Sequence, residues 1–220
     1  MNAMAVLYGP EHRALQDSHD SRRLADLWQD MLIHGELAED EQGFIASRDF
    51  FFLSTVDAQG KPTVSYKGGA SGFVRVLDAR TIAFPGYDGN GMFLSAGNIA
   101  ENASVGLLFI DFETPHRLRV QGEAELVREG ALVESFPGAA YVARIAVTDA
   151  FVNCGRYIHK MKRVETSRHV PDAGGDQPMA EWKRIDWVQP HLPEEDKAPA
   201  ARAGALTMEQ YGAKVVAGDT

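Results

Sequence analysis

The spacing of apolar residues changes sharply along the chain. Between residues 18 and 34 they recur every three or four positions, which predicts an amphipathic helix whose apolar stripe packs in the core. That stripe consists of Leu24, Leu27, Trp28, Met31 and Leu32. A second short helix is expected over residues 40–47, and residues 1–17 are expected to be loosely ordered.

From Phe50 onward the apolar residues follow the spacing of β-strands. Two hairpins are predicted over residues 50–67 and 73–84, and the first turns at Asp57-Ala58-Gln59-Gly60. Further strands are expected at 104–111, 116–127 and 141–151, with one short helix at 92–101. Helices of 10 to 15 residues, which a doubly wound sheet needs between its strands, are missing. The pattern therefore predicts a mainly β fold with flanking helices, built on an antiparallel six-stranded barrel.

The remainder of the chain is predicted to be an extension of this barrel. Residues 189–203 have the composition of a linker, and residues 206–216 are expected to form a short terminal helix. We therefore expect three parts. Residues 1–47 form a helical segment packing on the barrel, residues 48–170 form the barrel, and residues 171–220 form a C-terminal extension.

Composition narrows the classes of partner. The chain has 220 residues, a net charge of −9, 45% hydrophobic residues and 24% charged residues, which suits a globular protein. A nucleic-acid partner is disfavoured because basic residues are not in excess. No apolar run reaches the roughly 20 residues of a membrane-spanning helix, and Cys154 alone gives no internal disulfide. A cytoplasmic protein without a membrane or nucleic-acid partner is expected.

The most informative stretch for chemistry joins a glycine-rich loop to the start of a helix. Such a loop lets backbone N–H groups point outward, and the helix start favours an anion. Arginines two residues apart on a neighbouring strand would share one face, as would a serine and a lysine on another. Taken alone, each of these residues is more commonly a surface charge or a turn residue. Together they predict a phosphate site made of Ser65, Lys67, Asn90, Gly91, Arg117 and Arg119.

Other chemistries find less support. The seven histidines are scattered, with no pair at metal spacing, so no metal site is predicted. Cys154 lies near Arg156 and His159, which could activate a thiol, but a lone cysteine is more commonly packed. There is no hydrolase nucleophile motif. No residue is assigned a catalytic role.

Several segments together resemble a known family. They are GFVRVLDARTIAF from Gly72, NIAENASVGLLFID from Asn98 and RLRVQGEAEL from Arg117. In this order they are similar to the pyridoxamine 5′-phosphate oxidase-like family of FMN-binding split barrels. The segment NCGRYIHK from Asn153 also resembles one uncharacterised branch of it.

The resemblance implies a split-barrel homodimer with FMN at the subunit interface, each site drawing on both chains. Lys67 with its neighbours Ser65 and Tyr66 matches the strand that holds the flavin. Asn90 and Gly91 match the loop that reaches its phosphate. Arg117 and Arg119 match the strand facing the flavin ring or ribityl chain. An FMN-dependent oxidoreductase acting on a small molecule is the implied function.

The chain also departs from this family pattern. The vitamin-B6 oxidases carry a basic pair where this chain has Asn90-Gly91-Met92, and their C-terminal arginine-histidine motif is at best a remnant here, Trp187 to His191. Pyridoxamine phosphate is therefore disfavoured as the substrate. A protein that binds flavin, deazaflavin or haem without turnover, as a carrier or sensor, stays open as the alternative.

Overall fold

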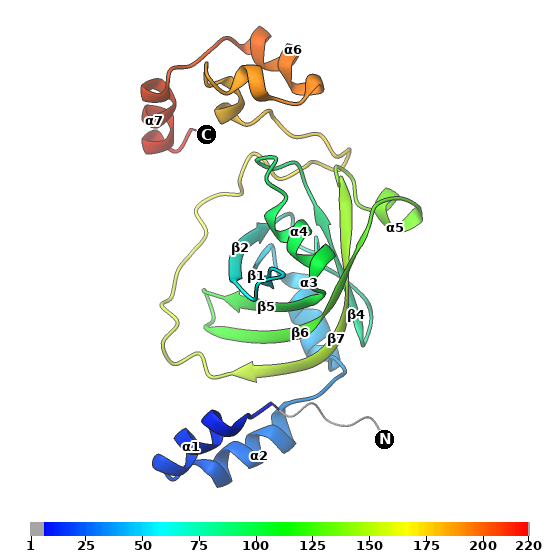
Figure 1. Ribbon diagram of the computed structural model, residues 1–220, viewed down its shortest axis with the longest axis vertical. Coiled ribbons are helices and arrows are strands. Elements are labelled where there is room, and N and C mark those ends of the chain that lie inside the picture. The colour runs from blue at the N-terminus through cyan, green and yellow to red at the C-terminus, as the bar shows by residue number, and fades with distance from the viewer. Residues whose placement is uncertain (1–6, 220) are drawn as a thin grey trace. The chain divides into compact units, whose positions relative to one another are not determined.

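A computed structural model describes residues 7–219. The described chain divides into two compact units, which meet between Arg163 and Val164. The first holds the sheet and helices α1 to α5; the second holds helices α6 and α7 and two short 3-10 helices (Figure 1). The boundaries expected near residues 47 and 170 stay predictions.

Seven antiparallel strands make one sheet in the first unit, in the order β2-β1-β5-β6-β7-β4-β3. The expected number of six is wrong, because the short strand β3 pairs with β4 as a full edge strand. No pairing within the described sheet joins its edge strands β2 and β3, so the sheet is not closed. The strands are β1 (Phe50–Val56), β2 (Pro62–Gly68), β3 (Arg75–Asp78), β4 (Thr81–Gly86), β5 (Ser104–Asp111), β6 (His116–Val127) and β7 (Tyr141–Asn153).

One face of the sheet carries the hydrophobic core. Strand β6 alternates from Leu118 to Glu125, with Leu118, Val120, Gly122 and Ala124 buried and the residues between them exposed. Phe51 and Phe109 pack in the centre, with ring centroids 5.2 Å apart. At Gly122 the register of β6 against β7 shifts, and a Cβ there would lie 2.4 Å from the Ala146 carbonyl oxygen. Glycine is therefore required at this bulge.

The helices of the first unit are α1 (Pro10–Ser18), α2 (Arg22–Leu32), α3 (Glu39–Ser47), α4 (Leu94–Glu101) and α5 (Ala131–Glu134). Helix α1 corrects the expectation that residues 1–17 are loosely ordered; of these, residues 1–6 lie outside the described part. A larger correction concerns α2, because its predicted core stripe is 38% to 69% exposed. Nothing on α2 is buried.

The second unit is small and helical. It contains η1 (Glu181–Arg184), η2 (Gln189–His191), α6 (Glu194–Ala203) and α7 (Met208–Ala217). Helix α6 falls within the expected linker, so that expectation is wrong for residues 194–203. The terminal helix expected at 206–216 is confirmed as α7. Its start is capped by Thr207, whose hydroxyl oxygen accepts a hydrogen bond from the Gln210 N–H.

Candidate functional site

A line of polar side chains runs between strand β2 and helix α4. Asn98 is buried on α4, and its Nδ2 donates to the hydroxyl oxygens of Thr55 (3.0 Å) and Thr63 (3.2 Å). The two threonines are themselves 2.9 Å apart across β1 and β2. Because the buried Asn98 and Thr55 and the half-buried Thr63 satisfy one another, they fix the rotation of α4 against the strands.

The same line continues toward solvent at Ser65 and Lys67. Ser95 lies one turn before Asn98 on α4, so it faces the same strand. Its Oγ is 3.2 Å from the Ser65 Oγ and accepts a hydrogen bond from the Lys67 Nζ at 3.3 Å. Sequence reasoning placed Ser65 and Lys67 on one face, which is confirmed, but it missed Ser95. The spacing of Ser95 and Asn98 on a short helix was the available signal.

Lys67 is half-buried and carries an unbalanced charge. Among the described residues no carboxylate lies within ion-pair distance of its ammonium group. Desolvation by burial lowers the pKa of Lys67 below its ordinary value. The first N–H groups of a helix have no intrahelical acceptor, and at the start of α4 no side-chain cap accepts from them either. Cation, hydroxyls and helix start together favour an anion here.

Asn90 and Gly91 lie on the exposed loop between β4 and α4. The Asn90 Oδ1 accepts a hydrogen bond from the Met92 N–H at 3.1 Å, and Gly91 has a φ of +76°. These two residues therefore shape the loop that leads into α4. No contact between either of them and Lys67 is present among the described hydrogen bonds. Phe93, which precedes α4, has an unfavourable φ of +47° and is 63% exposed.

The remaining predicted residues lie on the opposite face of the sheet. Arg119 is exposed on β6, with its guanidinium 5.9 Å from the ring centroid of Phe151 on β7. Register places one row of side chains across five strands on this face: Tyr66, Phe52, Leu108, Arg119 and Phe151. Within one chain, Tyr66 and Arg119 therefore share a face, while Ser65 and Lys67 point to the other face.

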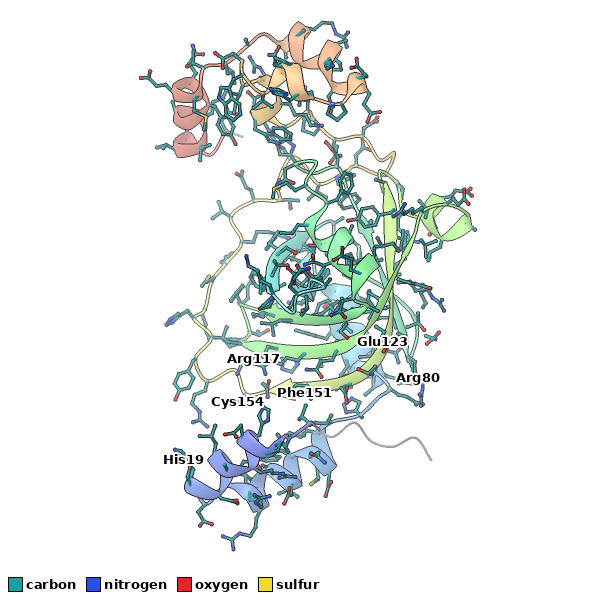
Figure 2. All side chains as sticks on the ribbon, in the orientation of Figure 1. His19, Arg80, Arg117, Glu123, Phe151 and Cys154 are labelled. Carbon is teal, nitrogen blue, oxygen red and sulfur yellow. The ribbon has the colours of Figure 1, made fainter. Side chains whose placement is uncertain are left out.

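Arg117 lies in the next row of that face, beside Asn153 on β7. The Arg117 Nε and the Asn153 Oδ1 are both buried, and neither has a hydrogen-bond partner among the described residues. Figure 2 marks Arg117 on β6 and Phe151 on β7. A buried donor and a buried acceptor side by side suit a ligand that offers both kinds of group.

A groove of about 420 Å³ lies on this same face. Its polar lining comes from Ser54, Ser104, Gln121, Glu123 and Thr148, and Gly106 also lines it. Register joins Ser54, Gly106 and Gln121 as one row, next to the row of Arg119. The volume falls within the usual range of about 300–1,000 Å³ for small-molecule sites. Sequence reasoning missed this groove, because it depends on neighbours that only strand order brings together.

Comparison with known proteins identifies the family. The family model described as pyridoxamine 5′-phosphate oxidase matches residues 37–171, more than half of the chain. The chain belongs to this family. The match covers the sheet and α3 to α5 but leaves out α1, α2 and the helices of the second unit. The family predicted from the sequence is thereby confirmed.

Comparison with solved structures finds partial similarities. HupZ of Group A Streptococcus is 24% identical over 53% of this chain and 93% of its own, with a TM-score of 0.44. An FMN-binding protein of Syntrophomonas wolfei is 14% identical over 64% and 97%, with a TM-score of 0.41. HutZ, a haem storage protein of Vibrio cholerae, is 21% identical over 51% and 90%, with a TM-score of 0.36. No curated protein matches this family member.

Residues 7–219 lack two further features. No helix there has the length and apolar content to cross a membrane. Nor does that part of the chain contain three histidine, cysteine, aspartate or glutamate side chains grouped to hold a metal ion.

Proposed function

We propose that this family member is an FMN-dependent oxidoreductase whose Lys67 holds the flavin phosphate. The uncompensated charge of Lys67 carries the proposal. A half-buried ammonium group without a carboxylate partner costs free energy, which a bound phosphate offsets. Ser65 and Ser95 offer hydroxyl groups to the phosphate oxygens, and the start of α4 offers backbone N–H groups.

We further propose that the active form is a homodimer with FMN at the subunit interface. Lys67 and Arg119 lie on opposite faces of one sheet, so one chain does not surround a single flavin with both. A second copy can present its outer face, with Arg117 and Arg119, to the Lys67 side of the first. This arrangement also gives the buried Arg117 Nε and Asn153 Oδ1 a partner in the ligand.

When bound, the flavin supplies the hydride-transfer chemistry. The protein's own part is to position it. Lys67 and the two serines would hold the phosphate, and Arg117 would offer positive charge and a hydrogen-bond donor to the rest of the flavin. The groove lined by Ser54, Gln121 and Glu123 suits a small-molecule substrate. We assign no catalytic acid or base, and flavin hydride transfer does not demand one.

A second candidate follows from the number of cations at the phosphate site. Within residues 7–219, Lys67 is the one cation that contacts Ser95, whereas a phosphate monoester carries close to two charges. A phosphodiester carries one charge, so a deazaflavin with a diester in its side chain would balance Lys67 alone. A carrier or sensor that holds flavin or haem without turnover is the corresponding non-catalytic function.

Titration of the purified protein with FMN, a phosphodiester deazaflavin and haem tests these functions. For the oxidoreductase we expect saturable FMN binding, bleaching of the bound flavin by NADPH or NADH, and return of the colour in air. Bound FMN that neither nicotinamide reduces would indicate the carrier. Exclusive binding of the deazaflavin would favour the second candidate. A protein that binds none of the three would contradict both proposals.

The affinity for FMN should fall as the pH rises, and the fall should begin at a lower pH than for a lysine with an ordinary pKa. Binding needs the charged form of Lys67, and burial lowers the pKa at which the free protein loses that charge. The dissociation constant, measured from flavin fluorescence above pH 7, should therefore rise as the pH passes through this lowered pKa. Lys67→Arg is the control, because guanidinium stays charged throughout. An equal decline in Lys67→Arg would show that another group controls binding.

A further inference from the structure

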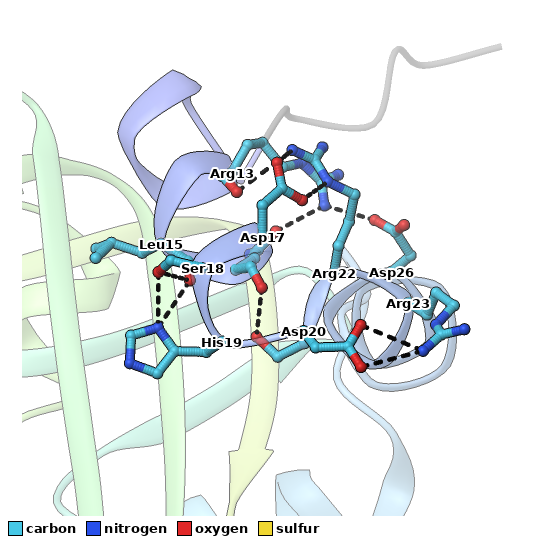
Figure 3. A network of polar contacts seen from close by, with 11 residues as sticks. Arg13, Leu15, Asp17, Ser18, His19, Asp20, Arg22, Arg23 and Asp26 are labelled. Carbon is cyan, nitrogen blue, oxygen red and sulfur yellow. Dashed lines mark hydrogen bonds and ion pairs between the residues drawn. The ribbon is translucent and has the colours of Figure 1, made fainter.

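Helices α1 and α2 form a hairpin, and Figure 3 shows the polar side chains that join them. The side of α2 that meets α1 is polar. Arg13 of α1 pairs with Asp26 of α2 at 2.6 Å, and Arg22 of α2 pairs with Asp17 of α1. The Tyr8 hydroxyl, before α1, donates to the Ala25 carbonyl of α2. Surface ion pairs of this kind stabilise a structure only slightly. Polar residues therefore lie between the two helices, and the apolar residues of α2 are exposed to solvent.

The outward side of α2 is a continuous apolar stripe. Its members are 49%, 46%, 46%, 69% and 38% exposed, in the order Leu24, Leu27, Trp28, Met31 and Leu32. Single exposed apolar residues are ordinary, but five on one helix face mark an interaction surface. The family match begins at residue 37, so this stripe lies outside the matched region.

The charges beside the stripe are self-complementary. Arg23 and Asp30 are seven residues apart, two helical turns, and so flank the stripe on the same side. Arg23 contacts Asp20 at 3.3 Å through side chains that are 87% and 90% exposed. No ion pair or hydrogen bond of the Asp30 carboxylate is present within residues 7–219. If two copies of α2 lie antiparallel about a two-fold axis, Arg23 of each copy lies beside Asp30 of the other copy. The ion pair is then formed twice.

We propose that α2 docks through this stripe on α2 of a second copy, antiparallel, with Arg23 and Asp30 closing the pair at both ends. The occupant is a second copy because both the apolar surface and the flanking charges complement themselves. An eleven-residue helix presents less than the roughly 800 Å² per partner of a standard interface, so the pairing is weak and reversible. It is independent of the flavin site and of any contact between the sheets.

Sedimentation velocity over a range of protein concentrations tests the docking. The full-length chain should show a concentration-dependent association step, and Leu27→Asp with Met31→Asp should abolish it. Both residues are exposed, so the variant should keep the circular dichroism and FMN affinity of the parent. Glu11→Lys on α1 is the matched surface control and should leave the step unchanged. A mass that does not depend on concentration, or one that the double variant leaves unchanged, would overturn the proposal.

Charge reversal tests the antiparallel arrangement separately. Arg23→Asp alone and Asp30→Arg alone should each weaken association by roughly tenfold, because each replaces two attractive contacts by repulsive ones. The combined variant recreates both pairs with reversed charges and should restore the parent's association constant to within about twofold. If the losses of association free energy in the two single variants simply add in the combined variant, the antiparallel pairing is wrong. This holds even if Leu27→Asp with Met31→Asp abolishes association.

Discussion

Replacing Lys67 with methionine should weaken FMN binding by roughly 10- to 150-fold, the loss expected for one hydrogen bond to a charged group. Riboflavin, which lacks the phosphate, should bind both proteins equally well. The variant should also unfold at a slightly higher temperature, because methionine removes a half-buried, uncompensated charge. Fluorescence titration and thermal unfolding measure the two effects. Binding loss with a stability gain is the signature of a residue kept for its ligand.

The control for this prediction is Lys61→Met, at the exposed turn before β2. It should change neither FMN affinity nor stability. An equal loss of riboflavin and FMN binding in Lys67→Met would contradict a role for Lys67 at the phosphate. Mixing Lys67→Met with Arg119→Ala tests sharing between subunits. A mixed dimer keeps one intact site if the two residues come from different chains, so part of the lost FMN binding should return.

Replacing Phe51 with alanine should lower the free energy of unfolding by about 3–5 kcal/mol. Phe51 is fully buried, and its ring centroid lies 4.9 Å from that of Phe84, 5.2 Å from Phe109 and 5.9 Å from Phe73. The cavity would thus open between β1, β4, β5 and the segment before β3. A domain is typically stable by about 5–15 kcal/mol, so the variant is expected to be marginal. Urea unfolding at fixed protein concentration measures the change.

Phe52→Ala is the matched control, one residue along the same strand. Phe52 points to the other face, where it is half-buried beside Phe50 and Tyr66. Its replacement should cost clearly less, on the order of 1–2 kcal/mol, in proportion to the smaller area buried. Equal losses for the two variants would contradict the assignment of the core to the Phe51 face.

Local patterns were sufficient to predict most of the sheet. Alternation in β6 and the turn after Asp57 identify strands and a hairpin, because both depend on neighbouring residues. Strand β3 was foreseen as part of a hairpin, but the total of seven strands depends on edge pairings that no local pattern reports. The stripe on α2 was assigned to the core for a related reason. Periodicity shows that a helix has an apolar face without showing what covers that face.

The site was predicted less completely than the sheet. The period of two placed Ser65 with Lys67 and Arg117 with Arg119, both correctly. It gave no information on whether the two pairs share a face of the folded sheet, which depends on registers between β2, β1, β5 and β6. Ser95 was missed because its role comes from Asn98, whose buried contacts with Thr55 and Thr63 set the rotation of α4.

The pairing of β4 with β7 affects how the protein folds while it is being synthesised. Strand β4 is made well before β7, yet β7 is the neighbour that covers the inner edge of β4. Such long-range pairing slows folding, because a long loop must close first. Until the ribosome has released β7, Ile82 and Phe84 belong to a hairpin with an open edge. A nascent chain that stalls before Tyr141 therefore displays an apolar strand of the kind that aggregates or recruits chaperones.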